Sequence, residues 1–333
     1  MNFNNLSYDW IDAMKTCIQD PVFHAEGDVW THTLMVLDES KKFDLNDEDR
    51  DILEWAILLH DMAKPQTRVI EDHVRHPKHA LKAADFAGNF LWRQGFSFEK
   101  MYKIRALVRY HSKPVHDCDV RELSCDVSLK LLAILAECDM RGRIGPIRDI
   151  DAALFKIDYF RELCKEYNCF EQPFFGNYAR FKSRSYDGYA HFDNTWGDCF
   201  LTCGVPGSGK STLCKEYNVV SLDELRVKHG ISPEKNQGTL LQIAKEECKK
   251  YLRKHESFVF DATNLISDLR IGWLSLMNEY NASPKIILPW TSPNVAFERN
   301  MKRENSVPVG VWNKMADSFE PPWKKEAVEI ILP

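Results

Sequence analysis

Residues 204–211 read GVPGSGKS, a complete phosphate-binding loop of the pattern G-x-x-x-x-G-K-S. The apolar, strand-like run 200–203 precedes it, and residues 211 to about 217 read as a helix, which is the context that this motif needs. Backbone N–H groups of such a loop can surround phosphates, and the positive end of the helix dipole adds to the attraction. We therefore expect a nucleoside triphosphate to bind through Gly204, Gly207, Ser208, Gly209, Lys210, Ser211 and Thr212.

Two side chains of this loop are suited to phosphoryl transfer. Lys210 can reach the β- and γ-phosphates, and the hydroxyl of Ser211 can hold Mg²⁺. An ordinary glycine-rich turn is the alternative, and the flanking strand and helix patterns speak against it. The sequence thus predicts ATP or another nucleoside triphosphate together with Mg²⁺.

Length and composition limit the remaining possibilities. A chain of 333 residues suggests two domains, because single cores stop growing below this size. The net charge of -5 gives no general nucleic-acid signal, so any such contact must come from a local patch. The ten cysteines form no C-x-x-C pair, which disfavours a structural zinc site. Neither a signal peptide nor a long apolar run is visible, so we expect no membrane contact and a cytoplasmic location with reduced thiols.

The N-terminal half must position a second set of reactive side chains. Residues 1–167 read as mostly helical, without convincing strands, and the clearest helix spans 46–64. Its start is acidic, its middle carries a broad apolar face, and Pro65 is expected to end it. His60 and Asp61 lie at its C-terminal end.

An adjacent His-Asp pair alone more often lies at the surface without a function, but this pair is accompanied by other candidate ligands. Further histidines and an aspartate lie at the ends of successive apolar helices, and a helical bundle can bring such ends to one pocket. Imidazole and carboxylate ligands suit Mn, Fe, Co, Ni or Zn rather than Ca. The sequence therefore predicts a transition-metal centre whose candidate residues are His32, His60, Asp61, His76, His79, His111 and Asp139.

The order H…HD…H…H…D resembles the HD phosphohydrolase superfamily, and GDVWTHTLMVLD and LLHDMAKP resemble the HD domains attached to tRNA nucleotidyltransferases. The resemblance implies an all-α helical bundle that binds one or two divalent metals and hydrolyses phosphomonoesters or cyclic phosphodiesters. It also implies that Asp61 takes part in catalysis. The implied core ligands are His32, His60, Asp61 and Asp139, with His79 and His111 as the extra histidines of two-metal members.

Three points of this assignment stay open. His76 lies in the same turn as His79 and is an alternative to it. Ala80 stands where related domains often carry Glu, which leaves the number of metals undecided. Lys64 follows the His-Asp pair by three residues, and it would either contact a phosphate or lie in solvent at the helix end.

The C-terminal half reads as alternating strands and helices, which is typical of a parallel sheet. Asp223 follows the second strand, where a doubly wound sheet places ligand-contacting residues, and its carboxylate can accept a proton from an attacking hydroxyl. A simple helix N-cap is the alternative role for Asp223. Arg226 could clamp an acceptor phosphate, and Asp261 ends the third strand as a residue that would orient magnesium water. The expected strands cover 200–203, 219–221, 258–260 and 285–289.

Arg299 and Arg303 are spaced i,i+4, so we expect them on one face of a lid helix. Such a lid can deliver two guanidinium groups to the transferring phosphoryl group, and a solvated basic face is the alternative.

The segments GVPGSGKST, SLDELR, FDATN and RNMKRENSVP resemble the 5′-polynucleotide kinase branch of the P-loop phosphotransferases. The resemblance implies an α/β P-loop kinase with a parallel sheet and a helical lid. Carried over residue by residue, it implies that Asp223 is the general base for a 5′-OH and that Arg226 contacts the phosphate of the acceptor. Lys210, Arg299 and Arg303 would bind the ATP phosphates.

The two halves together resemble the bifunctional HD-Pnk end-healing enzymes of RNA repair. We expect an HD phosphohydrolase domain at 1–169, a linker at 170–197 and a polynucleotide kinase domain at 198–333. The kinase would phosphorylate 5′-OH ends of RNA or DNA with Mg²⁺. The HD domain would remove 2′,3′-cyclic phosphate and 2′- or 3′-phosphate ends with Mn²⁺, Co²⁺ or Ni²⁺. No nucleotidyl-lysine motif of the K-x-D-G type is seen, so a separate RNA ligase would seal the ends.

Two other classes remain. One is a nucleoside or sugar kinase fused to a nucleotide phosphohydrolase. The other is a non-catalytic, nucleotide-switched RNA-binding protein, and the intact Lys210, Asp223, His60 and Asp61 argue against it. In the linker, Arg180, Lys182 and Arg184 alternate with aromatic residues, which suits either a nucleic-acid contact or a docked, solvated segment.

Overall fold

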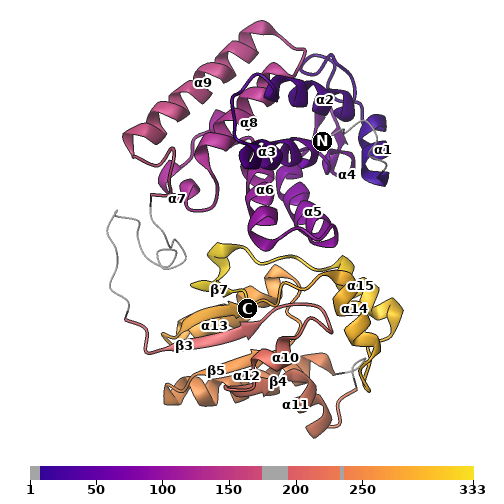
Figure 1. Ribbon diagram of the computed structural model, residues 1–333, viewed down its shortest axis with the longest axis vertical. Coiled ribbons are helices and arrows are strands. Elements are labelled where there is room, and N and C mark those ends of the chain that lie inside the picture. The colour runs from indigo at the N-terminus through magenta and orange to yellow at the C-terminus, as the bar shows by residue number, and fades with distance from the viewer. Residues whose placement is uncertain (1–7, 175–193, 233–235) are drawn as a thin grey trace. The chain divides into compact units, whose positions relative to one another are not determined.

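The computed structural model describes residues 8–174, 194–232 and 236–333 (Figure 1). Within them, one compact unit takes in residues 8–91 and 98–174, and the other takes in the remaining described residues. Because most of the junction lies outside the described residues, the domain limits 1–169, 170–197 and 198–333 stay predictions. Arg180, Lys182 and Arg184 also lie outside the described residues.

The first unit is a helical bundle, as the sequence predicts. Helices α2, α3, α6 and α8 pack on one another around a core of buried aliphatic and aromatic side chains. The helices of this unit are α1 (Asp9–Thr16), α2 (Val29–Ser40), α3 (Asp47–Leu59), α4 (Lys64–Thr67), α5 (His79–Arg93), α6 (Phe98–Tyr110), α7 (Val120–Ser124), α8 (Leu129–Arg141) and α9 (Ile147–Glu166), with a 3-10 turn, η2, at Lys113–Val115.

Local capping fixes where the central helices begin. The side chain of Asp28 accepts a hydrogen bond from the Thr31 N–H at the start of α2, and Asn46 does the same for Asp49 in α3. Each cap satisfies a backbone N–H group that the helix itself leaves free. The cap of α2 also places His32 one turn into the helix, where its side chain is fully buried.

Two expectations about this unit are wrong. The helix predicted for 46–64 ends at Leu59, and Pro65 lies in the first turn of α4 instead of ending a helix. Proline is tolerated there because first-turn N–H groups have no partner within the helix. The unit also contains strands, since β1 (Val69–Ile70) and β2 (Val74–Arg75) pair in an antiparallel hairpin. Two-residue strands are too short to leave a periodic pattern in the sequence.

The second unit carries the predicted parallel sheet, with strand order β4-β5-β3-β6-β7 (Figure 1). All four pairings are parallel, so the carboxyl ends of the strands lie along one edge. The strands are β3 (Asp198–Thr202), β4 (Asn218–Ser221), β5 (Phe258–Asp261), β6 (Ser283–Ile287) and β7 (Glu329–Ile331), of which β7 is not foreseen in the sequence analysis. The helices are α10 (Lys210–Leu213), α11 (Leu222–Lys228), α12 (Gln237–Lys254), α13 (Ser267–Glu279), α14 (Pro293–Met301) and α15 (Val309–Asp317), with a 3-10 turn, η4, at Lys324–Glu326.

A buried arginine supports the segment that follows β5. Arg270 in α13 is fully buried, and its Nε donates to Glu326 Oε2 at 2.6 Å. Its Nη1 donates to the carbonyl oxygens of Asn264, Leu265 and Glu320. A buried guanidinium is tolerated only when it is paired and fully hydrogen-bonded, and these contacts meet that condition. Among the described residues, no helix is long and apolar enough to cross a bilayer.

Candidate active sites

Three predicted ligands from three different elements form a first group in the helical unit. His32 of α2, His60 directly after α3 and Asp139 near the end of α8 each offer a donor atom, and these atoms lie within 4.8 Å of one another. His32 Nε2 is 2.9 Å from Asp139 Oδ1. All three side chains are buried. Two imidazoles and one carboxylate are a donor set for a first-row transition metal.

Asp61, His79 and His111 form a second group of the same kind, with donor atoms again within 4.8 Å. His79 Nε2 lies 3.3 Å from His111 Nε2 and 3.5 Å from Asp61 Oδ1. The first group lies next to it, because His60 Nε2 is 3.1 Å from Asp61 Oδ2. The structure therefore brings together all six predicted ligands, which are His32, His60, Asp61, His79, His111 and Asp139.

Backbone hydrogen bonds orient three of these imidazoles. The Nδ1 atoms of His60, His79 and His111 donate to the carbonyl oxygens of Ile57, His76 and Val108, at 2.6, 2.8 and 2.9 Å. In the neutral form of each ring, this bond keeps the hydrogen on Nδ1 and leaves the Nε2 lone pair for a ligand. The sequence placed each of these histidines three residues after its acceptor, at the end or start of a helix.

Unpartnered buried atoms show that this donor set fits a cation. His60 Nε2 and Asp61 Oδ1 are buried and make no hydrogen bond. Lys64 Nζ lies 2.6 Å from Asp61 Oδ2 and supplies one positive charge. Buried polar atoms without partners are costly, and a divalent metal would satisfy the lone pairs that remain.

Burial and charge set the protonation of the two groups differently. Burial lowers the pKa of His111 to about 3 and also lowers the pKa of His79, so both imidazoles are neutral at pH 7. Burial also opposes the charged form of His32, but hydrogen bonds with Asp139 and Glu26 outweigh it and raise the His32 pKa. Burial disfavours the Asp61 carboxylate, yet the charges of His60 and Lys64 hold its pKa well below the usual range.

Glu26 is a residue that the sequence analysis missed. Its Oε1 lies 3.0 Å from His32 Nδ1 and 2.7 Å from His24 Nδ1, and its Oε2 accepts from the Ile144 N–H at 2.8 Å. A carboxylate on the far nitrogen of a metal-binding histidine fixes its ring and raises its basicity. In the sequence, Glu26 and His24 lie six and eight residues before His32, and of these three residues only His32 was predicted to be a ligand.

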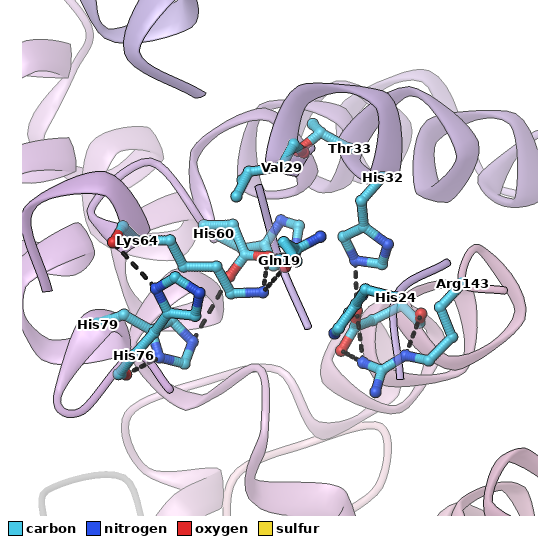
Figure 2. Close-up of polar contacts among 12 residues, drawn as sticks. Gln19, His24, Val29, His32, Thr33, His60, Lys64, His76, His79 and Arg143 are labelled. Carbon is cyan, nitrogen blue, oxygen red and sulfur yellow. Dashed lines mark hydrogen bonds and ion pairs between the residues drawn. The ribbon is translucent and has the colours of Figure 1, made fainter. Parts of the chain in front are cut away.

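Two cations flank the groups in Figure 2. Lys64 is 8% exposed, and its Nζ donates to Gln19 Oε1 at 2.7 Å besides pairing with Asp61, so the alternative of a solvated lysine is wrong. Arg143 Nη2 lies 3.0 Å from both carboxylate oxygens of Asp139. Figure 2 also shows Lys64, His76 and His79 together on the side of His60 that lies away from Arg143.

The structure places His76 and His79 differently. His76 Nδ1 donates to the Lys64 carbonyl oxygen at 3.0 Å, and His76 belongs to neither group of donor atoms. His79 contributes Nε2 to the second group. The geometry therefore favours His79 over His76 as a ligand.

In the phosphate-binding loop of the second unit, the Lys210 side chain is hydrogen-bonded to the backbone of the same loop. Lys210 Nζ donates to the carbonyl oxygens of Gly204 and Val205, at 2.7 and 3.0 Å. Burial, with a smaller contribution from the charge of Arg303, lowers the Lys210 pKa to about 8, while the charges of Asp261 and Asp223 oppose the shift. The helix predicted for 211–217 is the single turn α10, so its dipole adds less to phosphate binding than expected.

The other loop residues have distinct surroundings. Gly207 has a φ of +86°, and a Cβ there would lie 2.1 Å from the Ala296 carbonyl oxygen of α14. Thr291 Oγ1 donates to the Ser208 carbonyl oxygen at 2.9 Å, while the Ser208 hydroxyl is buried without a hydrogen bond. The Thr212 N–H donates to the Gly209 carbonyl oxygen at 3.1 Å, and Gly209 has a φ of +104°. The loop is therefore held directly by the chain segment that ends in α14.

A hydroxyl and a carboxylate lie in contact at the predicted magnesium site. Ser211 Oγ donates to Asp261 Oδ2 at 3.0 Å, and Thr202 Oγ1 lies 2.9 Å from Asp261 Oδ1. Asp261 ends β5, next to β3, so the strands themselves bring it to the loop. Oxygen ligands of this kind suit Mg²⁺, which retains several waters when bound. Thr202 also accepts a hydrogen bond from the Ala262 N–H at 3.1 Å, which fixes the chain beyond Asp261.

Asp223 and Arg226 face each other in α11. Ser221 caps this helix by accepting from the Glu224 N–H, so the alternative of Asp223 as N-cap is wrong. The Asp223 side chain is 86% exposed, and its Oδ1 lies 2.6 Å from Arg226 Nη1. Arg226 Nη2 donates to Gln237 Oε1 at 3.1 Å. The pair leaves the Asp223 carboxylate open to a solvent-side acceptor.

Of the two arginines predicted to lie on one lid helix, only Arg299 lies in a helix. Arg299 lies in α14, and its Nη1 is 4.0 Å from where a Cβ on Gly209 would be. Arg303 lies beyond the end of α14, so the prediction of one shared helix face is wrong. The buried Asn300 side chain bonds both backbone groups of Val307, which turns the chain out of the helix. Arg303 still lies close enough for its charge to act on Lys210.

Comparisons with known proteins define the class of each unit. Residues 29–139 match the family of the HD domain, and residues 200–322 match a family described as an AAA domain. The chain therefore carries an N-terminal HD domain, which contains the two groups of candidate metal ligands, and a C-terminal P-loop kinase-like domain.

Individual relatives are partial. A multifunctional CCA protein from Halorhodospira halophila is 42% identical over 77 residues, which is 23% of this chain and 17% of that protein. A solved structure from Chloroflexus aurantiacus, provisionally described as a kinase, shares 15% identity with a TM-score of 0.36 over 42% of this chain and 86% of its own. A gluconokinase structure from Sinorhizobium meliloti shares 16% identity with a TM-score of 0.31 over 41% and 82%.

Proposed function

We propose that this chain heals broken RNA ends, with a kinase that phosphorylates a 5′-OH end and a phosphohydrolase that removes a 2′,3′-cyclic, 2′- or 3′-phosphate. The observation that carries the proposal is the Asp223–Arg226 pair beside the phosphate-binding loop. Asp223, the proposed general base, lies there 2.6 Å from Arg226, the proposed cation for the acceptor phosphate, and the charge of Asp223 acts on Lys210. DNA ends belong to the same acceptor class.

In the kinase step, the Asp223 carboxylate would accept the proton of the terminal 5′-OH. The hydroxyl oxygen would form a bond to the γ-phosphorus of ATP while the bond to the β-γ bridging oxygen breaks and ADP leaves. Lys210, Arg299 and Arg303 would bind the phosphates and stabilise the charge that develops on them. Ser211, with Asp261 behind it, would hold Mg²⁺.

In the phosphohydrolase, the six ligands of the two groups would hold one or two divalent cations. Bound cations of this kind polarise a phosphoryl group and lower the pKa of water to near neutral. Lys64 and Arg143 already lie against the ligands Asp61 and Asp139, so they can balance the charge of an entering phosphate. The imidazole-rich donor set favours Mn²⁺, Co²⁺ or Ni²⁺ over Mg²⁺.

The second candidate is a nucleoside or sugar kinase fused to a nucleotide phosphohydrolase. Its acceptor would need an enclosed site that buries most of the ligand, as small-molecule pockets do. Asp223 is instead 86% exposed, beside Glu224, Val227 and Lys228. An open base is better suited to the end of a long polymer, whose remaining length stays in solvent.

One experiment tests both activities. The protein is incubated with an RNA that carries a 5′-OH and a 2′,3′-cyclic phosphate, with ATP, Mg²⁺ and Mn²⁺, and both ends are analysed. We expect a 5′-phosphate and a 3′-terminal diol. Faster phosphorylation of free nucleosides than of RNA would instead support the small-molecule kinase.

The proposal carries further expectations. It takes residues 1–169 as the HD domain, 170–197 as the linker and 198–333 as the kinase domain, and it requires a separate RNA ligase to join the healed ends. All ten cysteines are free thiols, in keeping with a reducing compartment such as the cytoplasm.

A further inference from the structure

A cavity of about 360 Å³ lies in the helical unit, between the segment before α2 and the start of α9. Its lining includes Phe23, His116, Met140, Arg143, Gly145 and Lys156. The volume is within the range of small-ligand pockets. None of the six predicted metal ligands lines it, so it is distinct from the metal groups themselves.

Two residues connect this cavity to the metal ligands. Arg143 lines the cavity while its Nη2 contacts both oxygens of Asp139. Glu26 contacts His32 Nδ1 through Oε1 and the Ile144 N–H through Oε2, and Ile144 precedes the lining residue Gly145. The Ala25 N–H also donates to the Ile144 carbonyl oxygen at 2.7 Å. The cavity wall and the ligands His32 and Asp139 therefore hold one another in place.

The lining offers the contacts that a nucleoside phosphate needs. Phe23 is 41% exposed, so part of this residue is open to a ligand, and an aromatic ring is a group on which a base can stack. Arg143 and Lys156 are cations for phosphates, and the carboxylate of Asp149 can accept hydrogen bonds from ribose hydroxyls or base N–H groups. Gly145 packs its Cα against the Phe23 carbonyl, where a Cβ would lie at 3.1 Å, so the loop that carries Phe23 is closely backed.

We propose that this cavity binds the nucleoside whose phosphate is hydrolysed at the metal groups, with the base stacked on Phe23. The proposal rests on the proposed phosphohydrolase function and adds the place where the nucleoside of the nucleotide end binds. Arg143 then contacts the phosphate on one side and the nucleoside cavity on the other, and thus aligns the two.

The test compares two substrates in Phe23→Ala and in a matched control, Phe155→Ala. Phe155 is an exposed phenylalanine of α9 that does not line the cavity. Adenosine 2′,3′-cyclic phosphate and glycerol 2-phosphate are each hydrolysed with Mn²⁺. In Phe23→Ala, we expect the kcat/KM ratio of the adenosine substrate over glycerol phosphate to fall about tenfold, mainly through KM. In Phe155→Ala, the ratio should stay at the wild-type value. An equal loss with both substrates in Phe23→Ala would overturn the proposal.

A binding measurement keeps the result separate from the proposed function. Equilibrium dialysis of adenosine 3′-monophosphate with Mn²⁺ uses Lys210→Ala protein, so that the phosphate-binding loop contributes little. Adding Phe23→Ala should weaken binding about tenfold, and adding Phe155→Ala should not. Phe23-dependent binding without hydrolysis of RNA ends would overturn the proposed function alone. Hydrolysis of ends with no effect of Phe23 on KM or binding would overturn the cavity assignment alone.

Discussion

His79 Nε2 and His111 Nε2 face each other across 3.3 Å, while the Nδ1 atom of each ring donates to a backbone carbonyl. In these tautomers, two lone pairs point at the same position. A proton on either ring is disfavoured because burial lowers both pKa values, that of His111 to about 3. A metal ion can therefore be shared by two rings that need not release protons at pH 7.

This relationship predicts different pH dependences for the two metal groups. The pKa of His32 is raised, so its proton persists above pH 6.5 and must leave before a metal binds the first group. Affinity at that group should rise with pH until the pKa of folded His32 is passed, by up to about tenfold per unit. Affinity at the second group should change less with pH over the same range, because burial lowers the pKa of both His79 and His111. Mn²⁺ titrations of His111→Ala, which retains the first group, and His32→Ala, which retains the second, would show this, and equal slopes would contradict it.

The two chemistries should separate by mutation. Lys210→Ala should abolish 5′-phosphorylation and leave phosphohydrolysis near wild type, because the lysine side chain donates its hydrogen bonds to loop carbonyls of the second unit. His60→Ala or Asp61→Ala should do the reverse. Both activities are measured on one RNA that carries a 5′-OH and a 2′,3′-cyclic phosphate, with circular dichroism as the folding control. Loss of phosphohydrolysis in well-folded Lys210→Ala protein would show that the sites are not independent.

Arg226 tests the acceptor side of the kinase. Arg226→Ala should remove a charge-assisted contact worth about 1.5–3 kcal/mol, which corresponds to a tenfold to hundredfold lower kcat/KM for an oligonucleotide. KM for ATP should change little. Arg253→Ala is a suitable control, because Arg253 is an exposed arginine of α12 that pairs with Glu246. A large rise in the KM for ATP, with a normal acceptor response, would place Arg226 on the donor side.

Gly207 tests how closely α14 packs on the phosphate-binding loop. Gly207→Ala would place a Cβ 2.1 Å from the Ala296 carbonyl oxygen at a φ of +86°. Collision and backbone strain together should cost about 2–4 kcal/mol and lower kinase activity at least tenfold. Gly238→Ala is the matched control, because a Cβ there meets no atom within 4 Å and the residue lies in α12. Thermal unfolding with and without ATP measures both effects, and equal behaviour of the two variants would refute the close packing.

Much of the fold could be predicted because its signals are local. The apolar faces of α3 and α8, the glycines of the loop and the strands that precede Gly204 and follow Lys285 all have periodic or motif-like patterns. The ends of elements were less predictable, since they depend on distant partners. The end of α14 follows from the two hydrogen bonds between Asn300 and Val307. The residues of the helix itself do not predict where it ends.

The candidate sites show the same limit. His60, Asp61 and Lys210 belong to recognisable motifs, and the histidines around them repeat at helix ends. Glu26 and Arg143 have no such motif, and their importance appears only when His32 and Asp139, which are 107 positions apart, come within 2.9 Å. Residues that orient ligands act through tertiary contacts, so a single sequence gives little sign of them.

The two hydrogen bonds from Lys210 to the loop carbonyls compete with any phosphate that binds to this lysine. Any anion that enters must displace contacts that are tethered in place and so compete at a high effective concentration. A single phosphate forms too few new bonds to replace the two Lys210 hydrogen bonds. A triphosphate with its magnesium forms enough bonds to replace both. Free inorganic phosphate, abundant in any cell, should therefore be a poor inhibitor of the kinase.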